Sequence, residues 1–170
     1  GFHTTALCSP TRASLLTGRN HHSVGMGALS NWDTGYPGYR GHVSKRAATV
    51  AELVKQHGWA TFAVGKWHLA PMTHTSAAGP YDYWPLQQGF ERFYGFLDGE
   101  TNQRHPALTQ DNSPLPVPDD PGYHLSEDLV DRSVAYVRDL TSVAPDKPFF
   151  LYLAFGAAHA PHQAPAELIA

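Results

Sequence analysis

Cysteine is nearly absent from this sequence, which has one, Cys8, among 170 residues. A single thiol excludes an internal disulfide framework and a zinc site built from several cysteines. Charge is sparse and nearly balanced, with a formal net charge of −3, so the chain lacks the basic surface typical of nucleic-acid-binding proteins. It also lacks a Lys/Arg block that would bind anionic membranes and an apolar run of transmembrane length. We therefore expect no nucleic-acid partner and no membrane segment in these residues.

Apolar residues make up 42% of the chain, which is enough for one globular domain with a buried core. The chain starts at Gly1 rather than at Met, and residues 165–170 resemble the first turn of another helix. We expect an internal piece of a longer protein; a complete small protein with a processed N-terminus is the alternative. The compartment is not predicted, because an N-terminal leader would lie outside such a piece.

Three helices are predicted from their capping signals. The first would be capped by Ser9 or Cys8, would carry Pro10 at its first position and would end at Gly18. The other two span residues 50–57, after a T-x-x-E capping box, and residues 126–140.

Two unbroken apolar runs, 59–64 and 149–155, predict buried strands, the second one central in its sheet. Residues 70–122 are rich in Pro, Gly, Asn and Asp and are predicted to be irregular. Apolar strands that alternate with helices are typical of a parallel sheet covered on both faces, so the predicted fold class is α/β. Ligands bind beyond the carboxyl ends of such strands. The segments that follow the two predicted strands, residues 65–69 and 156–162, both contain histidine.

Five side chains at these positions have the chemistry of an oxyanion site. Cys8 lies at a helix N-terminus, where free N–H groups favour anions, and Arg12 lies one turn further on. Lys66 and His68 are two residues apart, so an extended stretch would point both to one side. His162 follows the second predicted strand. Each residue alone also has a structural interpretation, such as a small buried thiol or an incidental loop histidine, but their convergence at one sheet edge favours a site.

Three stretches resemble the signatures of the type I sulfatases, the formylglycine-dependent members of the alkaline-phosphatase-like superfamily. Residues 8–19, C-S-P-T-R-A-S-L-L-T-G-R, match the first signature, C-x-P-S/T-R-x-x-x-L-T-G-R, at every defined position. Residues 58–69, G-W-A-T-F-A-V-G-K-W-H-L, resemble the second signature, and residues 160–165, A-P-H-Q-A-P, are similar to a later A-P-H-x-x-P loop. H-H-S-V-G-M-G at 21–27 and P-G-Y-R-G-H at 37–42 resemble the bacterial arylsulfatase-like branch.

The resemblance implies a three-layer sandwich with a mostly parallel central sheet, of which residues 1–170 form part of the N-terminal catalytic domain. It implies hydrolysis of aryl or alkyl sulfate esters to sulfate and a phenol or alcohol. In this family a formylglycine-generating enzyme oxidises the motif cysteine to an aldehyde, so the implied nucleophile is the hydrated aldehyde at Cys8. A serine could attack sulfur but could not eliminate the sulfate afterwards.

The family motifs also imply a role for each matching side chain. Arg12 would hold the formylglycine and stabilise charge, and Lys66 would bind sulfate oxygens and assist the leaving oxygen. His68 would orient the hydrate and take a proton during elimination. His162, the histidine of the A-P-H match, would donate to the leaving group, whereas His159 would support the site from outside.

The family uses a divalent cation, normally calcium, to polarise the sulfate. Its carboxylate ligands precede the cysteine motif or follow the A-P-H loop, so only the modified Cys8 would contact the metal here. None of Asp33, Asp98 and Asp128 matches those ligand motifs. We therefore expect residues 1–170 in isolation to be inactive, to bind calcium poorly and to fold poorly.

Three other functions remain open at this point. A phosphonate or phosphate monoester hydrolase of the same superfamily would use a similar tetrahedral anion site, and a non-catalytic relative would bind an anion or a glycan. A transition-metal binder is suggested by the eleven histidines, but their scatter along the chain disfavours it.

The aromatic residues of 81–96 would either line an aryl-accepting cleft or pack against other parts of the protein. Export to the periplasm or the exterior is common in the family.

Overall fold

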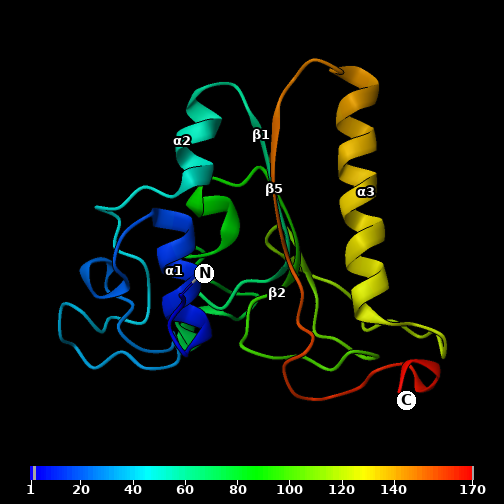
Figure 1. Cartoon of the computed structure of the whole chain (residues 1–170), viewed down its shortest axis with the longest axis horizontal. Coiled ribbons are helices and arrows are strands. Elements are labelled where there is room, and N and C mark those ends of the chain that lie inside the picture. The colour runs from blue at the N-terminus through cyan, green and yellow to red at the C-terminus, as the bar shows by residue number, and fades with distance from the viewer. Residues whose placement is uncertain (2, 170) are drawn as a thin grey trace.

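The computed structural model describes Gly1 and residues 3–169, which form three layers around a five-stranded sheet (Figure 1). Helices α1 and α2 cover one face of the sheet, and the long helix α3 covers the other. The helices are α1 (Cys8–Thr17), α2 (Val50–Gln56) and α3 (Leu125–Val143). The strands are β1 (Ala60–Lys66), β2 (Arg92–Phe96), β3 (Thr109–Gln110), β4 (Ser113–Pro114) and β5 (Phe149–Ala154).

The strand order is β4-β3-β2-β1-β5, with β1 parallel to both β2 and β5 and an antiparallel hairpin at the β3–β4 edge. This mostly parallel arrangement confirms the predicted α/β class. Two predictions were wrong. Residues 70–122 contain three strands rather than none, and β5 lies at an edge of the described sheet rather than at its centre.

Two apolar clusters lie on the two faces of the sheet. Strand β1 is buried throughout, and its side chains alternate: Phe62 and Val64 pack on the α3 side, whereas Ala63 packs on the α1 and α2 side. Helix α3 contributes Leu125 and Leu129 to its cluster. Packing of the two clusters holds β1 between the helical layers, and this also positions the residues that follow β1.

The helix ends agree only in part with the capping signals. Leu7 is the N-cap of α1, so Cys8 is its first helical residue and Pro10 its third; the predicted cap was wrong by one or two residues. Gly18 ends the helix in the left-handed conformation, as predicted. The capping box of Thr49 and Glu52 at the start of α2 is confirmed.

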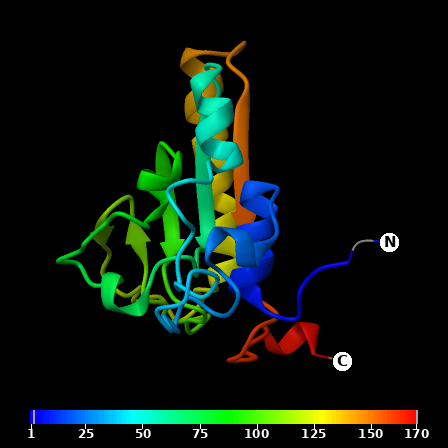
Figure 2. The same cartoon turned by 90° about the vertical axis from the view of Figure 1, so that its left-hand side faces the viewer.

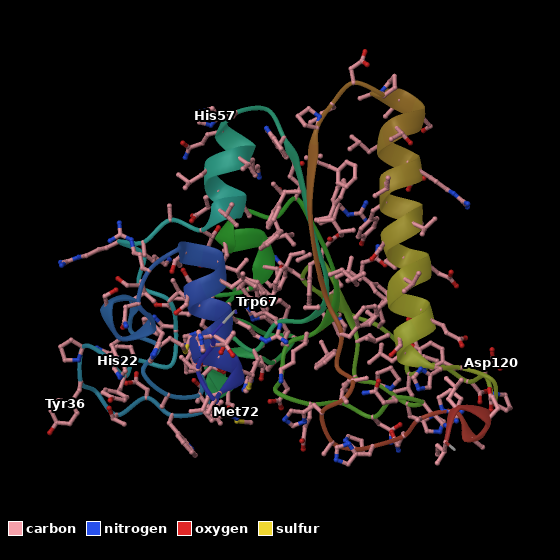
Figure 3. All side chains as sticks on the ribbon, viewed as in Figure 1. His22, Tyr36, His57, Trp67, Met72 and Asp120 are labelled. Carbon is pink, nitrogen blue, oxygen red and sulfur yellow. The ribbon has the colours of Figure 1, made fainter. Side chains whose placement is uncertain are left out.

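The N-terminal end of α1 and the segments that follow β1 and β5 lie at the same end of the molecule (Figures 1 and 2). This is the carboxyl edge of the parallel strands, where the sequence predicts a ligand site. Trp67, directly after β1, lies in the interior beside α1, whereas Tyr36 and Asp120 lie at the periphery (Figure 3). Among the described residues, no helix has the length and apolar character needed to cross a membrane.

Candidate active site

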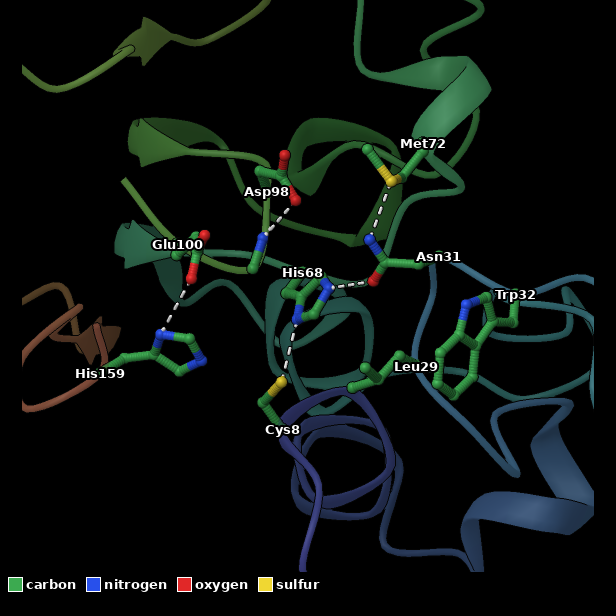
Figure 4. A pocket seen from close by; sticks show the side chains of 10 residues that line it. Cys8, Leu29, Asn31, Trp32, His68, Met72, Asp98, Glu100 and His159 are labelled. Atoms are coloured by element: carbon green, nitrogen blue, oxygen red, sulfur yellow. Dashed lines mark hydrogen bonds and ion pairs between the residues drawn. The ribbon is translucent and has the colours of Figure 1, made fainter. Parts of the chain in front are cut away.

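The side chains of Cys8 and His68 meet at the carboxyl end of β1. Cys8 Sγ lies 3.0 Å from His68 Nδ1, across 60 residues of sequence. Cys8 is half-buried on the first turn of α1, where the helix presents unpaired backbone N–H groups. Figure 4 shows the two side chains pointing at one another inside a pocket.

The backbone after β1 continues along β2 and carries His68 to this position. Trp67 N donates to Phe96 O over 2.9 Å, and His68 N donates to Leu97 O over 3.1 Å. His68 itself has φ 53, in the left-handed region that non-glycine residues enter rarely and often at functional sites. Residues 66–68 are therefore not fully extended, although the sequence prediction assumed that they were. Lys66 and His68 nevertheless both lie close to Cys8.

Lys66 and His68 are both only 4% exposed. Burial lowers the pKa of Lys66, an effect that the nearby Cys8 thiol partly offsets. Burial, reinforced by the Lys66 charge, lowers the pKa of His68 to about 4. At neutral pH the site therefore holds an uncharged imidazole beside the buried Lys66 side chain, and this imidazole can accept a proton.

Arg12 joins α1 to the sheet. Its Nη1 donates to the carbonyl oxygen of Lys66 over 2.8 Å and to the hydroxyl of Tyr152 over 2.9 Å. Its Nε is buried and makes no hydrogen bond with the described residues. The guanidinium thus holds the cysteine-bearing helix against β1 and β5.

Cys8 and His68 line a pocket of about 410 Å³. One side is apolar and is formed by Leu29, Trp32 and Met72, and Trp32 is 59% exposed. The opposite side is polar (Figure 4). It is formed by Asp98, Glu100 and His159.

Of the two histidines of the second loop, only His159 reaches the pocket of Cys8. His159 lines the Cys8 pocket, and its Nδ1 lies 3.5 Å from Glu100 Oε2. His162 is exposed and lines only the neighbouring pocket of about 510 Å³ beside the start of α3, which His159 also lines. Of the five predicted site residues, the structure thus brings Cys8, Arg12, Lys66 and His68 together and leaves His162 outside the group, so its predicted role stays a prediction.

Sequence reasoning missed several residues of the pocket. Asn31 Oδ1 lies 2.7 Å from His68 Nε2, and Trp32 follows it on the same loop. Nothing in the local sequence marks either residue, because both belong to a loop that reaches the pocket only through the tertiary fold. Of the aromatic residues at 81–96, none lines this pocket, and Trp84, Phe90 and Phe93 are each 1% exposed in the core.

The described residues do not gather the ligands of a metal site. No three His, Cys, Asp or Glu side chains among Gly1 and residues 3–169 are arranged to hold a metal ion. Calcium prefers six to eight oxygen ligands, several of them carboxylates. The described residues therefore do not by themselves form a calcium site.

The fold and this constellation agree with the comparison to known proteins. The family model described as Sulfatase matches residues 1–170, and the chain belongs to the sulfatase family. It is 32% identical to an arylsulfatase of Klebsiella aerogenes, an alignment that covers 99% of this chain and 36% of the relative. It is 33% identical to human arylsulfatase A, with 92% and 32% covered. The chain thus spans about a third of the length of these curated relatives.

Solved structures show the same fold. The crystal structure of Ps i-CgsB in complex with k-i-k-neocarrahexaose superposes with a TM-score of 0.72 at 26% identity, covering 94% of this chain and 36% of the other. A sulfatase structure from Pseudoalteromonas sp. gives a TM-score of 0.61 at 20% identity, covering 95% and 36%. The predicted family and fold class are thereby confirmed.

Proposed function

We propose that residues 1–170 form part of the N-terminal catalytic α/β domain of a longer sulfuric ester hydrolase that cleaves sulfate esters, with aryl esters as the first candidates. One observation carries this proposal: the cysteine of the C-x-P-T-R motif lies 3.0 Å from the Nδ1 of His68, beside the buried Lys66. The named arylsulfatases among the relatives support the aryl preference.

In this proposal Cys8 is matured by a formylglycine-generating enzyme. The Cβ of Cys8 is oxidised by two electrons and its sulfur leaves as sulfide. Dioxygen accepts these two electrons and two more from an external thiol reductant, so that one of its oxygen atoms ends in the aldehyde and the other in water. Water then adds to the aldehyde to give a hydrate with two hydroxyl groups. The Cys8 thiol, half-buried beside His68, stands in for those oxygens in the geometry described above.

One hydroxyl of the hydrate gives up its proton to solvent as its oxygen attacks sulfur, and the bond from sulfur to the ester oxygen breaks with its electron pair remaining on the leaving oxygen. Lys66, and Arg12 through the positive charge of its guanidinium, stabilise the charge on the sulfate oxygens. A proton must reach the leaving oxygen. We assign this donation to His159 in preference to His162, because His159 lines the pocket of Cys8.

Elimination returns the aldehyde. The second hydroxyl gives its proton to His68 Nδ1, its oxygen forms the C=O bond, and the bond from carbon to the sulfate oxygen breaks with its electron pair leaving on sulfate. The low pKa of His68, about 4, keeps the imidazole free to accept this proton at neutral pH. A second water then restores the hydrate.

Calcium, when bound, would polarise the sulfate as it does in the family. Its one contact in residues 1–170 would be the formylglycine at position 8, and we expect the carboxylate ligands from other parts of the protein.

The test is a comparison of matched aryl sulfate and aryl phosphonate esters with the matured longer protein. The account predicts a higher kcat/KM for the sulfate, and loss of that activity in the Cys8→Ala variant. A higher kcat/KM for the phosphonate would assign the protein to the phosphoryl-transferring side of the superfamily. Absence of turnover on both, with aldehyde present at residue 8, would favour an anion- or glycan-binding protein.

A further inference from the structure

The amide of Asn31 lies against the edge of His68 that faces away from Cys8. Its Oδ1 is 2.7 Å from His68 Nε2. Its Nδ2 lies 2.8 Å from Met72 Sδ, a weak acceptor, and this contact leaves the amide oxygen turned toward the ring (Figure 4). The imidazole of His68 is therefore held at both nitrogens, by Asn31 on one edge and by residue 8 on the other.

An amide oxygen can only accept a hydrogen bond, so His68 Nε2 must carry the hydrogen in this contact. A neutral imidazole has one N–H, and its other nitrogen keeps a lone pair. The Asn31 contact therefore selects the tautomer in which the lone pair of Nδ1 faces residue 8.

The residues packed around the His68 ring hold it in this same orientation. His68 is 4% exposed, and Gly99 lies against the ring so closely that a Cβ there would be 2.7 Å from His68 Cε1. The ring can therefore neither slide nor turn over without breaking a hydrogen bond. A base that must take a proton from one defined hydroxyl needs this restraint, because misplacement of the acceptor by about 1 Å costs about 100-fold in rate.

We propose that Asn31 is a positioning residue that fixes the Nε2–H tautomer of His68, so that Nδ1 is the atom that accepts the proton from the formylglycine hydrate during elimination. This inference rests on the proposed function. As the O–H bond of the hydrate breaks, its proton moves to Nδ1, and the Nε2–H bond to Asn31 remains in place. The amide oxygen then faces an imidazolium, which it stabilises as an acceptor.

The first test measures activity in the matured longer protein. Asn31→Ala is expected to lower kcat about 10- to 100-fold with KM changed less than about 3-fold, because the amide of Asn31 is already engaged by His68 and Met72 and acts through the position of the base. Asn31→Asp keeps an oxygen acceptor and should recover most of the lost kcat. Asn20→Ala is the matched control, since Asn20 is an exposed asparagine whose side chain caps a neighbouring turn. Wild-type kcat in Asn31→Ala would overturn the proposal.

The second test does not depend on turnover. Nitrogen-15 spectra of protein labelled at histidine should show His68 as the Nε2–H tautomer in the unmodified cysteine form and a mixture of tautomers in Asn31→Ala. Predominant Nδ1–H in the wild type would overturn the assignment. Failure of the wild type to carry an aldehyde or to turn over sulfate would refute the proposed function instead, and the spectra would still decide the role of Asn31.

Discussion

Gly99→Ala is the substitution that most directly tests whether the position of His68 matters. Gly99 is buried, lies outside the positive-φ region and packs against the His68 ring. A Cβ at this position would lie 2.7 Å from His68 Cε1 and 3.0 Å from Nε2. The backbone accepts alanine, so the ring is what must move.

The size of that movement follows from the contacts. The ring must retreat by roughly 0.7 Å before the Cε1 contact reaches an ordinary van der Waals distance of about 3.4 Å. It is pinned by the 2.7 Å bond to Asn31 and the 3.0 Å contact with Cys8, so the shift lengthens or bends at least one of them and weakens it. We expect kcat to fall about 10- to 100-fold, while overpacking lowers the free energy of unfolding by about 1–2 kcal/mol.

The assay is kcat on an aryl sulfate with the matured longer protein, measured beside urea unfolding. Gly122→Ala is the matched control, because its Cβ would meet nothing nearer than Asp120 Oδ1 at 3.4 Å. The reasoning would be refuted by a Gly99→Ala protein with unchanged kcat, or by a loss of rate fully accounted for by unfolded protein.

Three further predictions concern the fold and the pocket wall. Thr49→Val removes the N-cap of α2 and a buried 2.7 Å bond to a backbone carbonyl, so urea unfolding should show a loss of about 1–2 kcal/mol, largely recovered by Thr49→Ser. Burial and the carboxylate of Asp128 raise the pKa of Tyr94 above its unfolded value. This stabilisation is complete below about pH 10 and is lost as pH rises further, so Tyr94→Phe should show a shallower decline of stability above about pH 10 than the wild type. Trp32→Ala should raise KM for aryl sulfates about 10-fold without unfolding the protein, whereas the exposed Trp59→Ala, at the amino end of β1, should leave KM unchanged.

Local sequence signals were sufficient where short-range chemistry decides the structure. The capping box at Thr49, the stop at Gly18 and the unbroken apolar run of β1 all act within a few residues, and the structure confirms each of them. The N-cap of α1 was misplaced because Pro10 is acceptable anywhere in the first turn, where backbone N–H groups have no helical partner.

Strand β2 was missed because of its composition. Its sequence, R-F-Y-G-F, lies among Pro, Gly and Asn residues and contains a glycine, all of which weaken a strand prediction. It forms because β1 offers a parallel partner: Gly65 and Gly95 lie opposite one another in the register. Such long-range pairing leaves no local signal, so the edge position of β5 could not be predicted either.

The candidate site was accessible from sequence only in its motif residues. The convergence of Cys8, Lys66 and His68 follows from the rule that ligands bind at the carboxyl ends of parallel strands. Asn31, by contrast, reaches His68 through a loop whose path depends on the whole fold. The choice between His159 and His162 likewise depends on how the chain turns after β5, which the order of residues alone does not determine.

The central claim is that residue 8 supplies the nucleophile as formylglycine. Mass spectrometry of the tryptic peptide that ends at Arg12 tests it most directly, using the longer protein co-expressed with a formylglycine-generating enzyme and a second protein of known motif as the control. The account predicts a peptide that is lighter by the thiol-to-aldehyde change and that is captured by a hydrazide probe. An intact thiol at Cys8, with the control converted, would contradict it.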